Sequence, residues 1–323
     1  MNKLQQLRKM TTVVADTGDI DAIKQYMPTD ATTNPSLLYK AAQLPQYKAL
    51  VTSAVIYGNA NGQTSEEKTS LTLDKLAVNF GKEILNIIPG RVSTEVDARL
   101  SFNTDATIKR AEHLINMYKE EGVNQQRILI KIAATWEGIK AVEQLEKKGI
   151  HCNLTLMFNI AQAVAAAEAQ ATLISPFVGR ILDWYKKAEG VASYAAHQDP
   201  GVVSVKSIYN YFKKFNHNTT VMGASFRNAE EIIALAGCDL LTIAPTLMEE
   251  LQNSDEEITR TLNPESAKTM DIQKIDVSEP NFRWLMNEDP MATEKLAEGI
   301  RNFTVDTLKL EQYIHDSAEH RAA

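Results

Sequence analysis

Eight short apolar segments that alternate with helical patterns predict that this chain of 323 residues folds as a (β/α)8 barrel, or TIM barrel. No two expected strands follow each other directly, which favours a parallel sheet over hairpins. Eight such units in about 250 residues have the size of one barrel. The main alternative, a doubly wound sheet, lacks its phosphate-binding signature, because neither G-x-G-x-x-G nor G-x-x-x-x-G-K-[ST] occurs. We therefore expect one domain, residues 1–323, with extra helices at its N- and C-terminal ends.

The strands are placed by segments rich in β-branched and apolar residues that lie between helical patterns or turn residues. They are expected over residues 11–16, 30–34, 91–97, 127–133, 151–158, 172–177, 219–225 and 240–244.

Helices are expected where apolar residues recur with helical spacing between capping residues. An amphipathic helix over residues 2–10 precedes the first strand, and Pro35 lies where a helix after the second strand begins. Gly122 and Gly149 each close a helix. The further helices are expected over residues 16–26, 35–44, 46–58, 66–88, 105–121, 136–148, 159–170, 204–215, 228–236 and 246–252.

Two segments do not follow this alternation. Residues 178–203 are expected to form an excursion that includes a polar loop, and residues 253–289 to be irregular. Pro290 then opens a long helix, about 290–320, which we expect to pack on or across the barrel.

The composition is that of an ordinary globular protein, with 44% hydrophobic and 23% charged residues. The net charge of −7 is spread along the chain, so neither nucleic acid nor a membrane surface is an expected partner. The N-terminus has no apolar signal core, and no apolar run reaches the roughly 18 residues of a membrane span. Cys152 and Cys238 lie in or beside strands, where small buried thiols are expected. We therefore expect a cytoplasmic protein.

The fourth expected strand carries a lysine that cannot face bulk water. Lys131 shares one face of the strand with Leu129 and Ala133, opposite Ile130 and Ile132, and both faces of such a strand are covered. Burial disfavours the charged ammonium and can lower its pKa. A neutral amine attacks carbonyls and forms a Schiff base. The alternative is a structural lysine held in an ion pair.

Polar residues gather near the carboxyl ends of seven expected strands, where the active sites of such barrels lie. A barrel of purely structural purpose would fill these layers with Val, Ile and Leu. The candidates are Asp16, Asn34, Glu95 with Asp97 beyond it, Lys131, Asn153, Thr155, Ser175, Phe177, Ser225 and Arg227. One such residue alone is often a satisfied core group, but the whole set around one lysine predicts an active site.

Two carboxyl groups in this set can move the protons that Schiff-base chemistry requires. Forming the imine on Lys131 and losing water need a general acid or base, ideally a carboxyl tuned towards neutrality by burial. Glu95 and Asp16 are the candidates. The structural alternatives are that Asp16 caps a helix and that Glu95 pairs with Arg91 or Arg99.

Two arginines predict a phosphate site. Arg227 follows the seventh strand and Asn228 opens a helix, which matches the common phosphate site of barrels. Arg180 follows the sixth strand, and the planar arginine fork suits phosphate oxygens. A surface ion pair is the alternative for either arginine. The six histidines are scattered and no cluster has metal-ligand spacing, so neither a metal nor another cofactor is expected.

Seven motifs together resemble transaldolase, in the longer class of that family, over essentially the whole chain. They are residues 14–19 (VADTGD), 30–36 (DATTNPS), 90–97 (GRVSTEVD), 128–133 (ILIKIA), 152–156 (CNLTL), 174–180 (ISPFVGR) and 222–228 (MGASFRN). The resemblance implies a pentose phosphate pathway enzyme that moves a dihydroxyacetone unit between sugar phosphates. Sedoheptulose 7-phosphate and glyceraldehyde 3-phosphate would become erythrose 4-phosphate and fructose 6-phosphate.

The resemblance also implies a role for each motif residue. Lys131 would be the Schiff-base lysine and Asp16 would handle the proton of the hydroxyl at the cleaved bond, while Glu95 and Thr155 would hold a catalytic water. The residues implied to contact substrate are Asn34, Asn153 and Ser175 for the dihydroxyacetone unit, and Arg180, Ser225 and Arg227 for the acceptor phosphate. The family also suggests a homodimer without a cofactor.

Two other functions remain open from the sequence. The first is a class I fructose 6-phosphate aldolase that releases free dihydroxyacetone. Phe177 argues against it, because related aldolases carry tyrosine beside the catalytic water. The second is a non-catalytic sugar-phosphate-binding barrel in which Lys131 merely pairs with Glu95.

Overall fold

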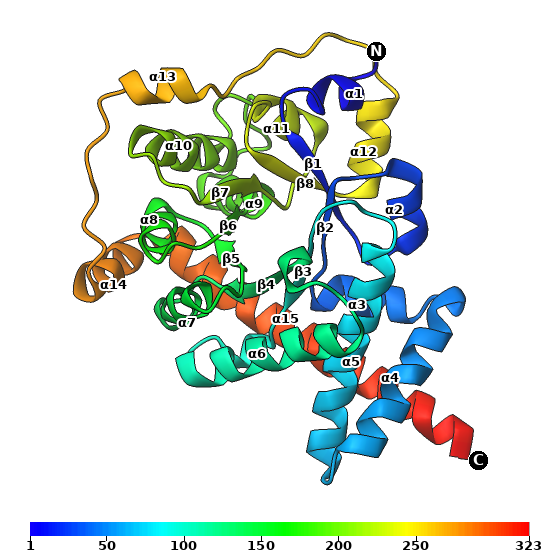
Figure 1. Ribbon diagram of the computed structural model, residues 1–323. Helices are drawn as coiled ribbons and strands as arrows, with labels where there is room; N and C mark the ends of the chain where they lie inside the picture. Colours follow the sequence, from blue (N-terminus) through cyan, green and yellow to red (C-terminus); the bar gives the residue numbers. More distant parts are fainter. Residues whose placement is uncertain (323) are drawn as a thin grey trace.

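The computed structural model describes residues 1–322 and contains a closed barrel of eight parallel strands in chain order, in which β8 pairs back to β1 (Figure 1). The barrel predicted from the alternation of strands and helices is thus confirmed. The strands are β1 (Thr12–Asp16), β2 (Asp30–Thr32), β3 (Val92–Glu95), β4 (Ile128–Ala133), β5 (Cys152–Met157), β6 (Leu173–Pro176), β7 (Thr220–Gly223) and β8 (Leu240–Ile243).

Helices surround the barrel and follow each strand along the chain (Figure 1). The helices up to the barrel's midpoint are α1 (Lys3–Leu7), α2 (Ile20–Tyr26), α3 (Pro35–Ala42), α4 (Lys48–Asn61), α5 (Ser65–Leu85), α6 (Thr104–Glu120) and α7 (Trp136–Lys147), with short 3-10 turns η1 (Pro45–Tyr47), η2 (Ala98–Leu100) and η3 (Gln125–Arg127). The later helices are α8 (Ile160–Glu168), α9 (Val178–Glu189), α10 (Pro200–Lys214), α11 (Ala229–Ala234), α12 (Pro245–Gln252), α13 (Pro264–Thr269), α14 (Glu279–Glu288) and α15 (Pro290–Ala322). None of the helices in residues 1–322 combines the length and apolar character that crossing a membrane requires.

The two faces of the barrel strands belong to different hydrophobic clusters. Ile130 and Ile132 join the large cluster that the helices share with the outer face of the barrel. Leu129 instead packs in a small separate cluster of inward side chains contributed by β1, β4, β6, β7 and β8, namely Val14, Leu129, Leu173, Met222 and Leu240. The alternation expected for β4 is therefore confirmed, and Lys131 shares the inward face with Leu129. Cys152 and Cys238 are both buried free thiols, as expected.

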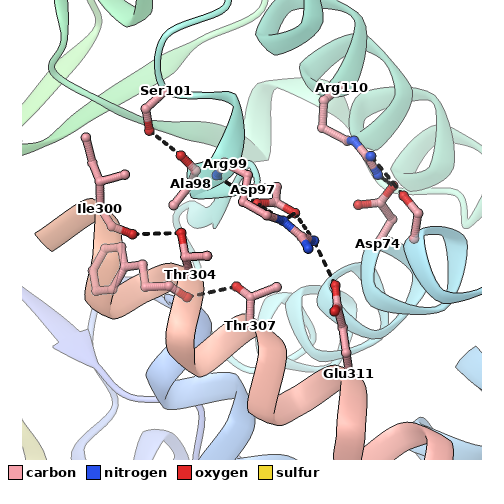
Figure 2. A network of polar contacts seen from close by, with 12 residues as sticks. Asp74, Asp97, Ala98, Arg99, Ser101, Arg110, Ile300, Thr304, Thr307 and Glu311 are labelled. Carbon is pink, nitrogen blue, oxygen red and sulfur yellow. Dashed lines mark hydrogen bonds and ion pairs between the residues drawn. The ribbon is translucent and has the colours of Figure 1, made fainter. Parts of the chain in front are cut away.

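Helix α15 lies across the carboxyl ends of several strands, where it packs against α3, α9, β5 and η2 (Figure 1, orange to red). Its buried apolar side chains form one hydrophobic cluster with residues of β5 and α9 and with Phe177. These side chains are Met291, Ala292, Ile300 and Phe303. Arg99 of η2 links this helix to the segment after β3, because its guanidinium donates to Asp97 (2.6 Å) and to Glu311 of α15 (2.7 Å) (Figure 2).

Three helices were not predicted from the sequence. Helix α9 lies in the segment 178–203, and α13 and α14 lie in the segment 253–289 that was expected to be irregular. Helix α9 begins without a side-chain cap: the N–H groups of Val178 and Gly179 instead donate to the carbonyls of Ala224 (2.8 Å) and Ser225 (2.7 Å), which follow the next strand, β7. Such a long-range cap leaves no local sequence signal.

Candidate active site

Lys131 lies on β4 and is only 4% exposed. The strand register places it beside Glu95 of β3 and Asn153 of β5. Its Nζ lies 3.2 Å from Glu95 Oε2 and donates to the carbonyl of Thr33 at 3.2 Å. The ion pair that the sequence left open as an alternative is therefore present, at the end of the barrel where β3, β4 and β5 terminate.

Asp16 ends β1 and accepts a hydrogen bond from Thr32 Oγ1 at 3.0 Å. Thr32 Oγ1 also lies 2.7 Å from Thr242 Oγ1 of β8. The helix-cap alternative for Asp16 is wrong, because Asp19 caps α2 by accepting from the backbone N–H of Asp21 (3.0 Å). Thr32 and Thr242 were not predicted as site residues from the sequence. Strand parity could have found Thr242, which lies two residues after an inward-facing leucine on β8.

Burial dominates the electrostatics of both carboxyl groups. It raises the pKa of Asp16 above its ordinary value, and Lys131, the Thr32 hydrogen bond and Arg180 offset this only in part. Burial likewise raises the pKa of Glu95, again against the attraction of Lys131. Both groups therefore hold a proton at a higher pH than exposed carboxyls do, which suits proton transfer near neutrality.

The expected arginine partners of Glu95 pair elsewhere. Arg91 lies 3.9 Å from Asp30, and Arg99 bridges Asp97 and Glu311. Glu95 therefore pairs with neither of these arginines but with Lys131 of the neighbouring strand.

A cavity of about 60 Å³ opens at this end of the barrel. Its lining comprises Asp16, Thr32, Asn34, Lys131, Ser175, Phe177, Arg180, Ala224, Ser225 and Thr242. Seven of these were predicted from the sequence, and Thr32, Ala224 and Thr242 were not. A wider hollow of about 890 Å³ lies at the surface between α5 and α6, where Arg110 pairs with Asp74 (Figure 2), but Lys131 does not line it.

Two other predicted residues are buried on β5 and do not line the cavity. Asn153 donates to Ser93 Oγ (3.1 Å) and accepts from Ser175 Oγ (2.6 Å), so it orients a residue that does line the cavity. Thr155 is fully buried, and its Oγ1 has no hydrogen-bond partner among the described residues. Asn34 lines the cavity and caps α3 by accepting from the N–H of Leu37 at 2.9 Å.

Among residues 1–316, whose side chains the structure describes, no carboxylate lies within ion-pair distance of Arg180. Its guanidinium carbon lies 4.8 Å from the ring centroid of Phe177 and 5.4 Å from that of Phe303. Burial, followed by the repulsion of Arg227, lowers the pKa of Arg180. A half-buried cation that contacts two aromatic rings and lines a polar cavity is suited to an anionic group of a ligand.

Arg227 lies at the rim and is exposed. Its guanidinium makes a two-pronged contact with Asp183 of α9, with Nη2 2.7 Å and Nε 3.1 Å from Oδ2. The surface ion pair that was the structural alternative for Arg227 is thus present. Within residues 1–322, no three His, Cys, Asp or Glu side chains are grouped so that they could hold a metal ion.

A closed barrel with a buried lysine, two buried carboxyl groups and an unpaired arginine at one mouth has the architecture of an enzyme that forms a Schiff base with a sugar phosphate. The family model described as transaldolase/fructose-6-phosphate aldolase matches residues 13–314. The chain belongs to this family and is an enzyme of the transferase type.

Curated relatives align over nearly the whole chain. A protein named transaldolase from Alteromonas mediterranea is 60% identical over 315 residues, covering 98% of this chain and 98% of that protein. A probable transaldolase from Drosophila melanogaster is 58% identical, covering 97% and 95% respectively. A transaldolase from Thermosynechococcus vestitus is 61% identical, covering 94% of this chain and 78% of that protein.

Proposed function

We propose that the cavity transfers a dihydroxyacetone unit from a ketose phosphate to an aldose phosphate, with the unit held as an imine on Lys131. The supporting observation is the burial of Lys131 in contact with Glu95, in the same cavity as Asp16 and Arg180. Fructose 6-phosphate or sedoheptulose 7-phosphate would be the donor, and glyceraldehyde 3-phosphate or erythrose 4-phosphate the acceptor.

The proposed reaction begins with attack of the Lys131 amine on the ketone carbon of the donor, which gives a carbinolamine. Glu95 donates a proton to the departing oxygen, which leaves as water, and the imine forms. Asp16 then removes the proton of the hydroxyl on the neighbouring fragment, and the carbon–carbon bond breaks. The electron pair of that bond moves into the imine to give an enamine, and an aldose phosphate departs. The same steps in reverse join the enamine to the acceptor.

The remaining site residues have supporting roles in this proposal. The raised pKa values of Asp16 and Glu95 support their use as acid and base. The unpartnered Thr155 hydroxyl supports a role with Glu95 in holding the catalytic water. Residues proposed to orient the three-carbon unit are Asn34, Asn153 and Ser175, and those proposed to bind phosphate are Arg180, Ser225 and Arg227.

We also propose that residues 1–323 form one domain and that the enzyme is a homodimer in the cytoplasm. The packing of α15 on the barrel supports the first point, and family membership supports the other two. Light scattering on the purified protein tests the dimer, because the measured mass is then expected to be twice the chain mass of 35.9 kDa.

Borohydride trapping tests the imine. Reduction in the presence of fructose 6-phosphate is expected to attach the three-carbon unit to Lys131, as read by peptide mass spectrometry. Lys75 provides an internal control, because it is also a buried lysine in an ion pair, with Glu121, but lies outside the cavity. Labelling of Lys75 instead of Lys131, or of neither, would falsify the proposal. Lys131→Ala is expected to abolish turnover and trapping while the circular dichroism spectrum is retained.

An acceptor assay separates the transferase from a simple aldolase. Loss of fructose 6-phosphate is expected to depend strongly on an added aldose phosphate. Rapid release of free dihydroxyacetone without an acceptor would contradict the transferase assignment. Phe177 packs edge-on against Phe158 (5.6 Å between centroids) and lines the cavity without offering the hydroxyl that tyrosine would bring.

A further inference from the structure

The loop between β7 and α11 carries two of the proposed phosphate ligands in a strained conformation. Ser225 has φ +62°, which is costly for a residue other than glycine and persists only where the surroundings hold it. On one side, the N–H of Gly179 donates to the carbonyl of Ser225 at 2.7 Å. A side chain at Gly179 would meet this carbonyl, since an added Cβ would lie 2.5 Å from it. The first half of the loop is therefore held by the start of α9.

The second half of the loop is held by a buried carboxyl group. The backbone N–H of Arg227 donates to Glu231 Oε2 at 2.7 Å, and Glu231, on α11, is only 1% exposed. Asn228 caps the same helix by accepting from the N–H of Glu231 at 2.9 Å. Glu231 is therefore the side chain that fixes where the backbone of Arg227 lies.

Glu231 also contacts a second buried acid. Glu231 Oε1 has no hydrogen-bond donor among the described residues, and the carboxyl group of Asp199, which is 3% exposed, lies in hydrogen-bonding contact with Glu231. Asp199 in turn caps α10 by accepting from the N–H groups of Gly201 (2.8 Å) and Val202 (3.3 Å). Two buried carboxyl groups in contact are both satisfied only when one proton is shared between them.

We propose that Glu231 and Asp199 form a one-proton carboxyl pair that positions the phosphate-binding loop, which makes Glu231 a positioning residue for phosphorylated substrates. This inference rests on the proposed phosphate site at Ser225 and Arg227. It extends that site to the end of the segment between α9 and α10, because Asp199 lies there and the pair joins this segment to α11.

The charges around the pair define how it titrates. Burial, with a further contribution from Asp199, raises the pKa of Glu231 to about 7. Asp183 of α9 adds negative charge, while Arg227 in the loop adds positive charge and is itself paired with Asp183. Glu230, the neighbour of Glu231 on α11, is exposed to solvent. Loss of the shared proton above neutral pH leaves two carboxylates in contact, so they separate and the anchor of Arg227 moves.

The test compares Glu231→Gln, Glu231→Ala and the control Glu230→Gln. Glutamine keeps an acceptor for the Arg227 N–H and offers a permanent N–H donor to Asp199, so it imitates the protonated pair at every pH. Each enzyme is assayed from pH 6 to 9 with saturating fructose 6-phosphate, using glyceraldehyde 3-phosphate or unphosphorylated D-glyceraldehyde as acceptor. Thermal unfolding checks that each variant is folded.

The expected result is that KM changes for the phosphorylated acceptor and not for the unphosphorylated one. For the wild type and Glu230→Gln, KM for glyceraldehyde 3-phosphate rises about fivefold or more between pH 6.5 and 8.5, in the range usual for coupled sites. For Glu231→Gln, KM for glyceraldehyde 3-phosphate also changes between these pH values, but the fold-change is at least about threefold smaller than for the wild type. The titration of the substrate phosphate is common to all the enzymes and cancels in this comparison. Glu231→Ala raises KM for glyceraldehyde 3-phosphate by about tenfold, the loss expected for one hydrogen bond to a charged group, and leaves KM for D-glyceraldehyde within about twofold.

Equal effects of Glu231→Ala on the two acceptors, or an unchanged pH profile in Glu231→Gln, would overturn the inference. Arg227→Ala distinguishes failure of the proposed phosphate site from failure of the positioning role of Glu231. If Arg227→Ala does not weaken the phosphorylated acceptor, the proposed phosphate site is wrong. If Arg227→Ala weakens it and Glu231→Ala does not, only the positioning role of Glu231 is wrong.

Discussion

Replacement of Phe303 by leucine tests whether α15 takes part in substrate binding. Phe303 is buried on α15, and its ring centroid lies 5.4 Å from the guanidinium carbon of Arg180. Phe177 covers the guanidinium at 4.8 Å and is left unchanged. Leucine preserves most of the apolar packing of Phe303 and removes one of the two aromatic contacts of Arg180.

The size of the effect follows from the burial of Arg180. A cation–π contact contributes about 0.5 kcal/mol at an exposed site and about 2 kcal/mol where the cation is desolvated. Without the ring of Phe303, the phosphate itself must immobilise the guanidinium, so up to this energy is lost from binding. At about 1.4 kcal/mol per factor of ten, KM for a phosphorylated acceptor rises by about 2- to 30-fold. Repacking adds up to about 1.5 kcal/mol to the loss of folding free energy.

The assay measures KM for glyceraldehyde 3-phosphate and D-glyceraldehyde, together with the midpoint of thermal unfolding. Phe212→Leu is the matched control, because Phe212 is equally buried but lies on α10 in the outer layer of helices. Both variants are expected to unfold at lower temperature, and only Phe303→Leu is expected to raise KM for the phosphorylated acceptor. If the two variants lose stability alike and neither changes KM, Phe303 acts through packing alone and takes no part in phosphate binding.

Three further substitutions test individual groups. Asp16→Asn and Glu95→Gln should each lower kcat by about 10²- to 10⁴-fold, the range usual for losing a general acid or base, and normal turnover would remove these assignments. Because burial raises the pKa of Asp16, its ionised form costs stability as pH rises from the ordinary aspartate value through the folded-state pKa. Asp16→Asn should therefore unfold at higher temperature than the wild type at pH 8 and lose this advantage near pH 4; the opposite trend in thermal scans would contradict it. Asp183→Asn removes the exposed partner of Arg227, and such pairs contribute at most about 1 kcal/mol, so KM for phosphorylated acceptors should fall by up to about fivefold. A rise in KM would mean that Asp183 positions Arg227 and does not compete with the phosphate.

The parity of strands made much of the site predictable. Alternation on β4 was enough to place Lys131 on the inner face, and the same rule placed Asp16 and Ser175 at the mouth. The partner of each group was less predictable, because a strand register joins residues far apart in the chain. Glu95 therefore pairs with Lys131 of the next strand instead of a nearby arginine.

The helices and the side chain that were not predicted depend on contacts between distant segments, which leave no local pattern in the sequence. Helix α9 takes its N-terminal acceptors from the loop after β7, so the local residues carry no capping signal. The segment after β8 is polar because most of α13 and α14 faces solvent, and only residues such as Phe282, which lies 5.2 Å from Trp136, reach the core. Glu231 was overlooked because its role requires Asp199, which lies in a different β/α unit.

Because α15 follows all the barrel strands in the sequence, it is the last part of the site to be synthesised. The eight strands lie within residues 12–243, whereas the second aromatic ring that contacts Arg180 belongs to Phe303. Domains emerge from the ribosome N-terminal end first, at about 5–20 residues per second, so the barrel can close several seconds before Phe303 is available. A nascent chain in this interval carries Lys131 and both carboxyl groups but holds Arg180 against one ring only. Catalytic competence towards phosphorylated sugars is therefore acquired late in synthesis, when α15 docks.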